Sequence, residues 1–282
     1  MDRLISFLVP AFIGLCSSQA AAAEFCRFSA DRSASVDAVG ATRLIIDAGA
    51  GDLLVRGGNN LRSVEATARV CAFKEAALAQ TQIVARREGT ILYVTTVLPE
   101  ASGIVSWLET SLDVAVTLPA SLSVELKDGS GDLSISRVRS AKIEDGDGNI
   151  KVGQIAGDVV VSDGAGDMDI DQIVGKVTIE RDDAGDIHIE DVRRDVNVLL
   201  DTSGTLQVER VGGSVHIGQD SSGDIVIREI KGNALVDSDS SGDIRAVLVG
   251  GNFVVEADST GKISHDRVEG SVRMPPDRDR DQ

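Results

Sequence analysis

Residues 220–238 read DSSGDIVIREIKGNALVDS, and the pattern of this stretch returns through the whole second half of the chain. Each return carries a glycine, an aspartate three residues before it and aliphatic residues after it, and successive glycines lie 17 to 19 residues apart. The glycines are Gly131, Gly148, Gly166, Gly185, Gly204, Gly223, Gly242 and Gly261. The aspartates are Asp128, Asp145, Asp163, Asp182, Asp201, Asp220, Asp239 and Asp258. A fixed period of this length is typical of a solenoid, in which each repeat packs on the next one.

Within one repeat, aliphatic residues alternate with polar residues, which is the pattern of short β-strands with one buried face. The expected inward positions are Ile225, Ile227, Ile230, Ala234 and Val236. A second glycine falls nine residues after the first in most repeats and marks a second turn. Strands this short cannot bury a face alone, so the repeats gain stability by stacking as parallel coils. The sequence therefore predicts an all-β fold, a single-stranded, right-handed β-solenoid or β-helix with coils of about 19 residues.

The regions on either side of the repeats are different in character. Residues 24–120 are less regular and are interpreted as a β-rich N-terminal capping region, residues 121–274 carry the repeats, and residues 275–282 form a charged tail that we expect to be disordered. Caps are expected because an exposed sheet edge at either end promotes polymerisation. Gly51–Val55 echoes the repeat turn, so this region is also interpretable as an irregular start of the same solenoid. Strands are expected at 42–47, 52–55, 61–70, 82–87, 91–97 and 111–118, and a short helix at 73–79.

The first 23 residues have the layout of a secretory signal peptide. Arg3 precedes an apolar stretch of about 12 residues, and Ala21 and Ala23 occupy the small positions of a cleavage site. That stretch is too short to cross a bilayer, and no later segment of the sequence reaches the required length. We expect an exported chain without a transmembrane segment in its mature form, with the periplasm as the default location and the cell surface as the alternative.

Two cysteines, Cys26 and Cys71, remain after the expected cleavage. Because thiols oxidise outside the cytoplasm, we predict one disulfide between them. The alternative is two free buried thiols, since the distance between them cannot be read from the sequence.

The charge of the chain excludes one large class of partners. A formal net charge of -17 and a pI near 4.5 produce a field that repels polyanions. We therefore expect no nucleic-acid partner.

The run Leu112–Ile135, which reads LDVAVTLPASLSVELKDGSGDLSI, leads into repeats of the form D-x-x-G-D-[IL]-x-[IV]. In this run and these repeats the chain resembles the putative-adhesin family of bacterial beta-strand-repeat proteins, a family without an assigned function. The resemblance implies a β-solenoid in an extracytoplasmic or membrane-associated setting. It brings no catalytic residues to transfer, and the adhesin label is an analogy at the level of the fold.

The repeated aspartates carry most of the chemistry. In register, they would form a column of like charges at about 4.8 Å, which must be offset. One interpretation is that each aspartate caps its own turn by accepting backbone N–H groups. The other is weak calcium binding, because two turns are similar to the glycine-aspartate repeats of calcium-binding β-rolls. The candidate calcium ligands are Asp145, Asp147, Asn149, Asp163 and Asp167.

The sequence argues weakly for an enzyme. Polysaccharide-cleaving solenoids need paired carboxylates in a groove walled by aromatic residues, and this chain has only eight aromatic side chains. His188 and His216 are expected to face outward and His265 inward, and Tyr93 and Trp107 are interpreted as packing residues. We predict a non-catalytic, exported β-solenoid without a cofactor, acting as a cell-envelope scaffold or adhesin-like binding module for an unknown envelope protein or glycan. The alternatives are a carbohydrate-active β-helix enzyme and a calcium-dependent surface module.

Overall fold

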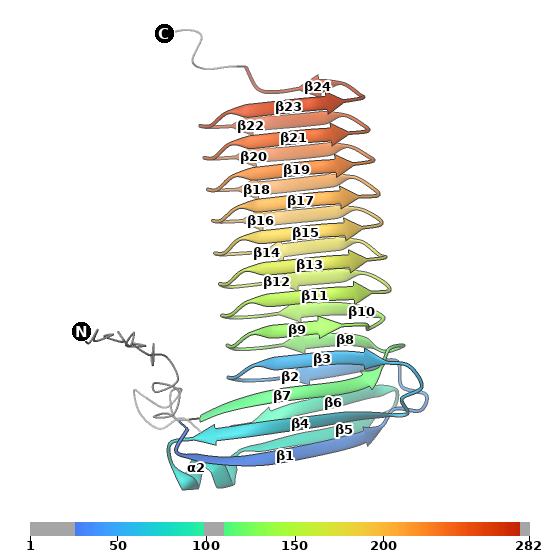
Figure 1. Cartoon of the computed structure of the whole chain (residues 1–282), viewed down its shortest axis with the longest axis vertical. Helices are drawn as coiled ribbons and strands as arrows, with labels where there is room; N and C mark the ends of the chain where they lie inside the picture. Colours follow the sequence, from blue (N-terminus) through green and yellow to red (C-terminus); the bar gives the residue numbers. More distant parts are fainter. Residues whose placement is uncertain (1–25, 99–109, 277–282) are drawn as a thin grey trace, which may run out of the picture.

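The computed structural model describes residues 26–98 and 110–276. These residues form two sheets of 12 strands each and one short helix, α2 (Glu75–Gln80). The sheets face each other along an elongated stack, with the helix at one end (Figure 1). The expected signal peptide, Trp107 and most of the charged tail lie outside the described residues.

The stack consists of coils that contribute one strand to each sheet. In the first sheet the strands of the repeats are β9 (Leu133–Ser136), β11 (Ile150–Ile155), β13 (Met168–Ile173), β15 (Ile187–Val192), β17 (Leu206–Val211), β19 (Ile225–Ile230), β21 (Ile244–Val249) and β23 (Ile263–Val268). In the second sheet they are β8 (Ser123–Lys127), β10 (Ser140–Glu144), β12 (Val159–Ser162), β14 (Val177–Arg181), β16 (Val196–Asp201), β18 (Val215–Asp220), β20 (Ala234–Asp239), β22 (Phe253–Asp258) and β24 (Val272–Arg273).

Neighbouring coils are parallel and in register. Ile225 of β19 pairs with Leu206 below it and with Ile244 above it, and equivalent residues pair along both sheets. The five inward positions of the repeat at 220–238 are each at most 2% exposed. Branched aliphatic side chains therefore stack on similar side chains above and below, which fills the core without aromatic rings. This confirms the predicted β-solenoid.

The first coil of the stack comes from a distant part of the chain. β2 (Arg43–Asp47) pairs in parallel with β8, and β3 (Leu53–Gly58) pairs in parallel with β9. Residues 43–58 thus lie directly beneath the coil that begins at residue 123, and the echo of the repeat turn at Gly51–Val55 marks a true coil. The solenoid begins inside the region interpreted as a cap.

The far side of this first coil is covered by longer strands. β7 (Thr110–Pro119) pairs in parallel with β3, and then β4 (Ser63–Ala72) and β1 (Phe28–Asp37) continue the sheet in antiparallel order. In the second sheet, β6 (Ile91–Val97) pairs in parallel with β2, and β5 (Gln82–Glu88) pairs antiparallel with β6. The sequence prediction lacks β1, because this strand alternates half-buried and exposed small or polar residues rather than aliphatic ones.

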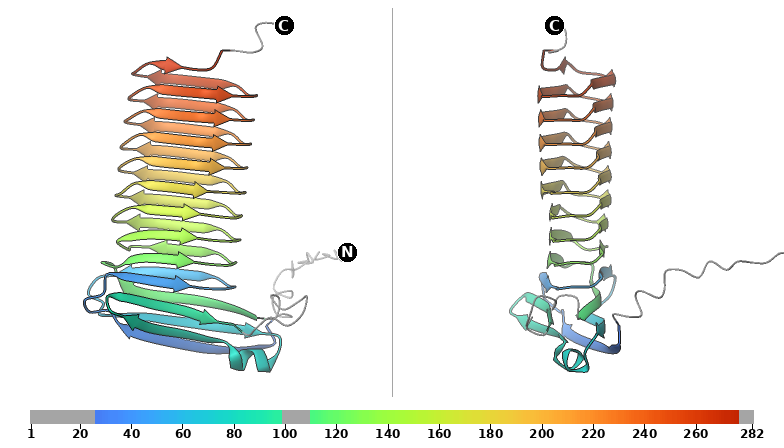
Figure 2. Two further views of the ribbon diagram at one scale, coloured as in Figure 1. Left: turned by 180° about the vertical axis from the view of Figure 1, so that it is seen from behind. Right: turned by 90° about the vertical axis from the view of Figure 1, so that its left-hand side faces the viewer.

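Two contacts fasten the cap. A disulfide joins Cys26 to Cys71, whose Cα atoms are 5.0 Å apart. The guanidinium of Arg32 on β1 donates hydrogen bonds to the carbonyls of Leu78, 2.8 Å away, and Thr81, 3.1 Å away. The helix therefore closes the lower end of the stack, as the side view shows (Figure 2).

The upper end of the stack has less cover. β23 is the last strand of its sheet, and β24 above the other sheet is only two residues long. His265 occupies the inward-type position predicted from the sequence, where it pairs in register with Ala246, but it is exposed because no full coil lies above it.

Candidate functional site

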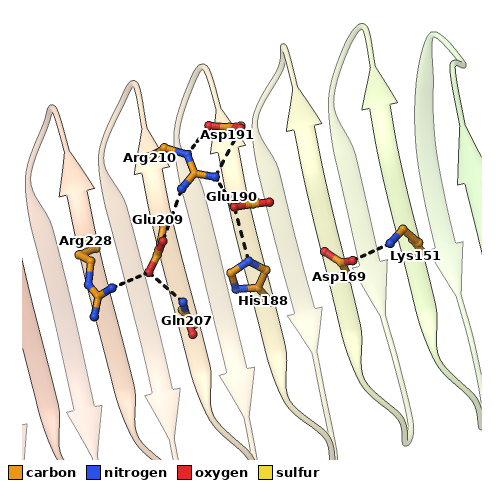
Figure 3. A network of polar contacts seen from close by, with 9 residues as sticks. All are labelled: Lys151, Asp169, His188, Glu190, Asp191, Gln207, Glu209, Arg210 and Arg228. Atoms are coloured by element: carbon orange, nitrogen blue, oxygen red, sulfur yellow. Dashed lines mark hydrogen bonds and ion pairs between the residues drawn. The ribbon is translucent and has the colours of Figure 1, made fainter.

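A network of charged side chains covers the outer face of the first sheet (Figure 3). The Arg210 guanidinium contacts the carboxylates of Glu190 and Asp191, the latter at 2.6 Å, and lies 3.5 Å from Glu209. Arg228 extends the network with a contact of 3.2 Å to Glu209. The hydrogen bonds that Arg210 donates to the carboxylates of Asp191 and Glu190 raise the pKa of its guanidinium, so its charge is fixed. Exposed ion pairs of this kind add little stability, but a network holds its side chains in defined positions.

A groove runs along the edge of this face, where each coil turns toward the second sheet. It has a volume of about 1740 Å³ and extends from Gln154 to Glu269, across the coils that begin at β11 and end at β23. Buried valine and isoleucine side chains form its floor, and charged residues including Arg193, Glu229 and Lys231 form its rim. The groove presents an elongated surface with both apolar and charged contacts.

The groove follows a column of unusual backbone conformations. One residue in each coil, six residues after the repeat glycine, has a φ between 53° and 60°. These residues are Arg137, Gln154, Gln172, Asp191, Arg210, Glu229, Leu248 and Arg267. All of them except Arg137 line the groove. Non-glycine residues rarely adopt this region, and such strain is often found at ligand-binding sites. The sequence analysis missed this column because its side chains share no common type.

A second depression lies at the junction of the cap and the first coil. It has a volume of about 780 Å³ and is lined by residues of β1, β3, β4, β7 and β9. Arg69 of β4 sits in register between Asp31 of β1 and Asp113 of β7. The Asp113 Oδ1 atom accepts a hydrogen bond of 3.2 Å from the backbone N–H of Asp52, so part of this acidic lining stabilises the strand pairing.

The repeated aspartates point into the solenoid rather than along its surface. Six of them are at most 4% exposed: Asp128, Asp163, Asp182, Asp201, Asp220 and Asp239. Some use one carboxyl oxygen in their own turn, as Asp128 does with the N–H of Gly129 at 2.8 Å and Asp239 with the N–H of Ser241 at 3.1 Å. Both carboxyl oxygens of Asp145, Asp182, Asp201 and Asp220 have no such partner, so the turn-capping role of the repeated aspartates stays a prediction.

Burial changes the acidity of this column. Desolvation is the largest cause in every case, and neighbouring carboxyl groups add to it along the column. The pKa is raised to about 7 for Asp128, about 6 for Asp163, about 8 for Asp182, about 6 for Asp201, about 7 for Asp220 and about 7 for Asp239.

The candidate calcium ligands are divided between two different environments. Asp145 and Asp163 belong to the inward column, where burial raises the pKa of both. Asn149 and Asp167 stand after the glycine, and their Oδ1 atoms accept backbone N–H groups of the next coil at 3.1 and 3.0 Å. Within residues 26–98 and 110–276, no three His, Cys, Asp or Glu side chains converge as a metal site. Calcium binding stays a prediction.

Polar side chains also connect the coils at the second turn. Asp195 accepts the N–H of Ser214 at 2.8 Å, and Ser214 Oγ accepts the N–H of Asn233 at 3.0 Å. Asn233 then accepts the N–H of Asn252, and Asn252 accepts the N–H of Ser271. The sequence pattern that indicates this ladder is an Asp, Asn or Ser ten residues after the repeat glycine. The ladder was not among the sequence predictions.

The histidines lie far apart in the fold. His188 contacts Glu190 on β15 at 3.6 Å, whereas His216 on β18 lies in the other sheet, 2.8 Å from Asp237. His265 is on the last coil, with its ring centroid 6.3 Å from that of Phe253. Tyr93 on β6 packs against Arg86, whose guanidinium carbon lies 3.8 Å from the centroid of the tyrosine ring. The described part of the chain therefore does not bring the histidines together as a catalytic group.

No helix among the described residues has the length and apolar character needed to span a membrane.

Solved structures match most of the chain at low sequence identity. A putative adhesin from Bacteroides fragilis is 14% identical, with 88% of this chain and 98% of that chain covered and a TM-score of 0.37. A putative lipid binding protein from Parabacteroides distasonis is 15% identical, with 87% and 96% covered and a TM-score of 0.40. A putative cell adhesion protein from Clostridium sporogenes is 12% identical, with 88% and 99% covered and a TM-score of 0.31.

No curated protein matches the chain. The family model of the Toastrack proteins, DUF4097, matches residues 72–271 and so spans the repeats together with part of the cap. The chain belongs to the Toastrack DUF4097 family.

Proposed function

We propose that this protein is an exported, non-catalytic β-solenoid that serves as a scaffold or adhesin-like binding module in the cell envelope, with the periplasm as its location. Its partner in this proposal is an elongated envelope glycan or an extended segment of an envelope protein.

The groove from Gln154 to Glu269 is the observation that carries this proposal. It crosses successive coils at one repeated position, so a partner lying in it would meet the same backbone geometry at intervals of about 4.8 Å. A linear partner fits such a periodic surface better than a compact small molecule does. The parallel hydrogen bonds of both sheets hold the groove in shape before binding, which lowers the entropic cost of association.

The rim of the groove offers free cations for recognition. Among the described residues, Arg193 and Lys231 have no carboxylate within ion-pair distance, whereas Arg210 is held by Glu190 and Asp191. Unpaired rim charges can select an anionic group on a partner without losing an internal ion pair. Acidic glycans and acidic protein segments are therefore the preferred partners within the proposal, despite the negative charge of the whole chain.

Binding to purified envelope polymers tests the proposal. The mature chain is immobilised and exposed to peptidoglycan fragments, neutral polysaccharides and acidic polysaccharides. A variant with Arg193→Glu and Lys231→Glu should lose at least about tenfold in affinity for the bound polymer. The control carries Lys127→Glu and Lys262→Glu at the opposite turn, which makes the same change in net charge, and should bind as the wild type does. Equal losses in both variants, or no binding of any polymer, would contradict a groove-based function.

The same samples separate the alternative functions. New reducing ends or unsaturated products after incubation with a polysaccharide would indicate a carbohydrate-active enzyme. Binding that disappears with a chelator and returns with millimolar calcium would indicate a calcium-dependent module. The proposal expects neither result.

A further inference from the structure

Three aspartates in the upper half of the solenoid form a continuous buried column. Asp201 is 0% exposed, and Asp220 and Asp239 are each 2% exposed. Asp201 pairs in register with Asp220, and Asp220 with Asp239, through the strand pairs β16–β18 and β18–β20. Three identical carboxyl groups therefore follow one another inside the fold at the strand spacing of about 4.8 Å.

Most oxygens of this column have no well-formed hydrogen bond. Both carboxyl oxygens of Asp201, both of Asp220 and Oδ2 of Asp239 are buried without one, although backbone amides of the following turn act weakly on the carboxyls. Only Oδ1 of Asp239 accepts a well-formed bond, from the N–H of Ser241 at 3.1 Å. A buried carboxylate with poor hydrogen bonding is very unfavourable, and such a group gains by taking up a proton.

The charged groups that face the column are all acidic. Asp182 pairs with Asp201 from the coil below, and their carboxyls interact. Asp186 also acts on Asp201, Asp201 acts on Asp220, and both Asp220 and Asp258 act on Asp239. Burial raises the pKa of Asp201 to about 6 and the pKa values of Asp220 and Asp239 to about 7, with these neighbours adding to the shift. The backbone amides of the following turn oppose the shift without cancelling it. No lysine or arginine is among the groups that act on these three carboxyls.

We propose that Asp201, Asp220 and Asp239 bind protons in mild acid and form a ladder of carboxylic acids, in which one carboxyl donates its O–H to an oxygen of the carboxyl in a neighbouring coil. A protonated carboxyl has one donor and keeps acceptor capacity, so a column of them can satisfy its own oxygens. The proton is then the ligand that joins successive coils, and the solenoid responds to the acidity of its surroundings.

The sign of the pH effect follows from the raised pKa values of these carboxyls. In the unfolded chain each carboxyl has the ordinary pKa of 3.8, so the folded state binds more protons than the unfolded state above that pH. The stabilisation is complete below about pH 4 and is lost as the pH rises through about 6 to 7. This column therefore makes the solenoid most stable in mild acid, opposite to the usual effect of ion-paired carboxylates.

Two measurements on the mature chain test the ladder. Infrared difference spectroscopy between about pH 5 and about pH 9 should reveal the carbonyl stretch of buried carboxylic acids at the lower pH. The melting temperature should fall by an amount on the order of 5 °C over the same range. In the triple variant Asp201→Asn, Asp220→Asn, Asp239→Asn, the infrared band should weaken and the fall should become smaller, because neutral amides also stack as ladders. Part of the fall should remain, because Asp128, Asp163 and Asp182 keep their raised pKa values.

The matched control changes three aspartates of the neighbouring outer ladder. Asp186→Asn, Asp224→Asn and Asp243→Asn keep an oxygen for the backbone N–H groups of the next coil, which these side chains bind in the wild type. This control should keep the pH-dependent melting temperature. If the inner triple variant does not fold, the same infrared comparison between the wild type and the single variant Asp220→Asn decides the question.

Three results would overturn the proposal. The first is an absent carboxylic-acid band at about pH 5. The second is a pH dependence that is as large in a folded inner triple variant as in the wild type. The third is a melting temperature at about pH 9 that rises with sodium, potassium or calcium chloride but not with choline chloride, since the column would then hold a metal cation in place of protons.

Discussion

The coils and the cap bury similar aliphatic side chains, but the edges of their strands are paired and covered in different ways. Each coil pairs in parallel with an equivalent coil above and below it, so one short sequence pattern satisfies strand after strand. The cap reverses to antiparallel pairing and adds a helix and a disulfide. Repetition therefore stabilises the middle of the rod, whereas its end depends on particular residues that occur once.

The sharpest contrast is between a glycine of the coils and a glycine of the cap. A Cβ atom at Gly223, where φ is +133°, would lie 1.6 Å from the carbonyl oxygen of Gly204, while a Cβ at Gly89 meets nothing within 4 Å. We expect Gly223→Ala to destabilise the protein by about 4 kcal/mol or more, because adjacent coils must separate. Gly89→Ala should cost only about 1 kcal/mol from its positive φ. Urea denaturation followed by circular dichroism measures both, and equal losses would mean that the coils do not pack as closely as described.

Removing the disulfide should weaken the cap selectively. Its cysteines are 45 residues apart in the sequence, and closing a loop of this size stabilises a fold by about 4 kcal/mol in the chain-entropy model. In a Cys26→Ser, Cys71→Ser variant, we expect faster hydrogen exchange in β1 and β4 and unchanged exchange in β17 to β21. Uniformly faster exchange along the rod would show instead that cap and coils unfold as one unit.

A smaller effect is expected from the polar ladder between coils. Asp224 accepts the backbone N–H of Asp243 at 2.9 Å, so Asp224→Ala should cost about 1 kcal/mol. Asp224→Asn should restore most of this loss, because Asn233 and Asn252 make the equivalent bond at the second turn. The free energy of unfolding in urea distinguishes the two variants. If asparagine were as damaging as alanine, the charge rather than the acceptor would be the stabilising feature.

The smallest effect is expected on the outer face. Arg210→Ala removes contacts to Glu190, Asp191 and Glu209 but should lower the free energy of unfolding by less than Asp224→Ala does, because the guanidinium is solvated and its ion pairs are screened by water. Calorimetry at low and high salt checks this, with Arg228→Ala as the neighbouring control. A larger loss would place part of the stability of the coils in their charged surface.

The repeated coils could be predicted from the sequence. The position of the first coil in the stack could not. The inward position of residues such as Ile227 could be predicted because every coil repeats the same constraint. The placement of residues 43–58 beneath residue 123 could not, because a strand that pairs across such a distance leaves no periodic mark. The echo of the turn at Gly51–Val55 was the only local signal.

The candidate site was predictable only where side-chain type repeats. The aspartate column was visible from its period, but its burial was not, because aspartate is usually exposed. The left-handed column along the groove includes arginine, glutamine, aspartate, glutamate and leucine, none of which indicates a positive φ. Its conformation is imposed by the stacked coils rather than by local preference.

The early position of residues 43–58 in the chain has a consequence for assembly. In a chain that emerges with its N-terminus first, the surface on which the first regular repeat must settle has already emerged when that repeat follows. Each later repeat then finds its predecessor in place, so the rod can lengthen from its N-terminal end, one layer at a time, without waiting for the C-terminus.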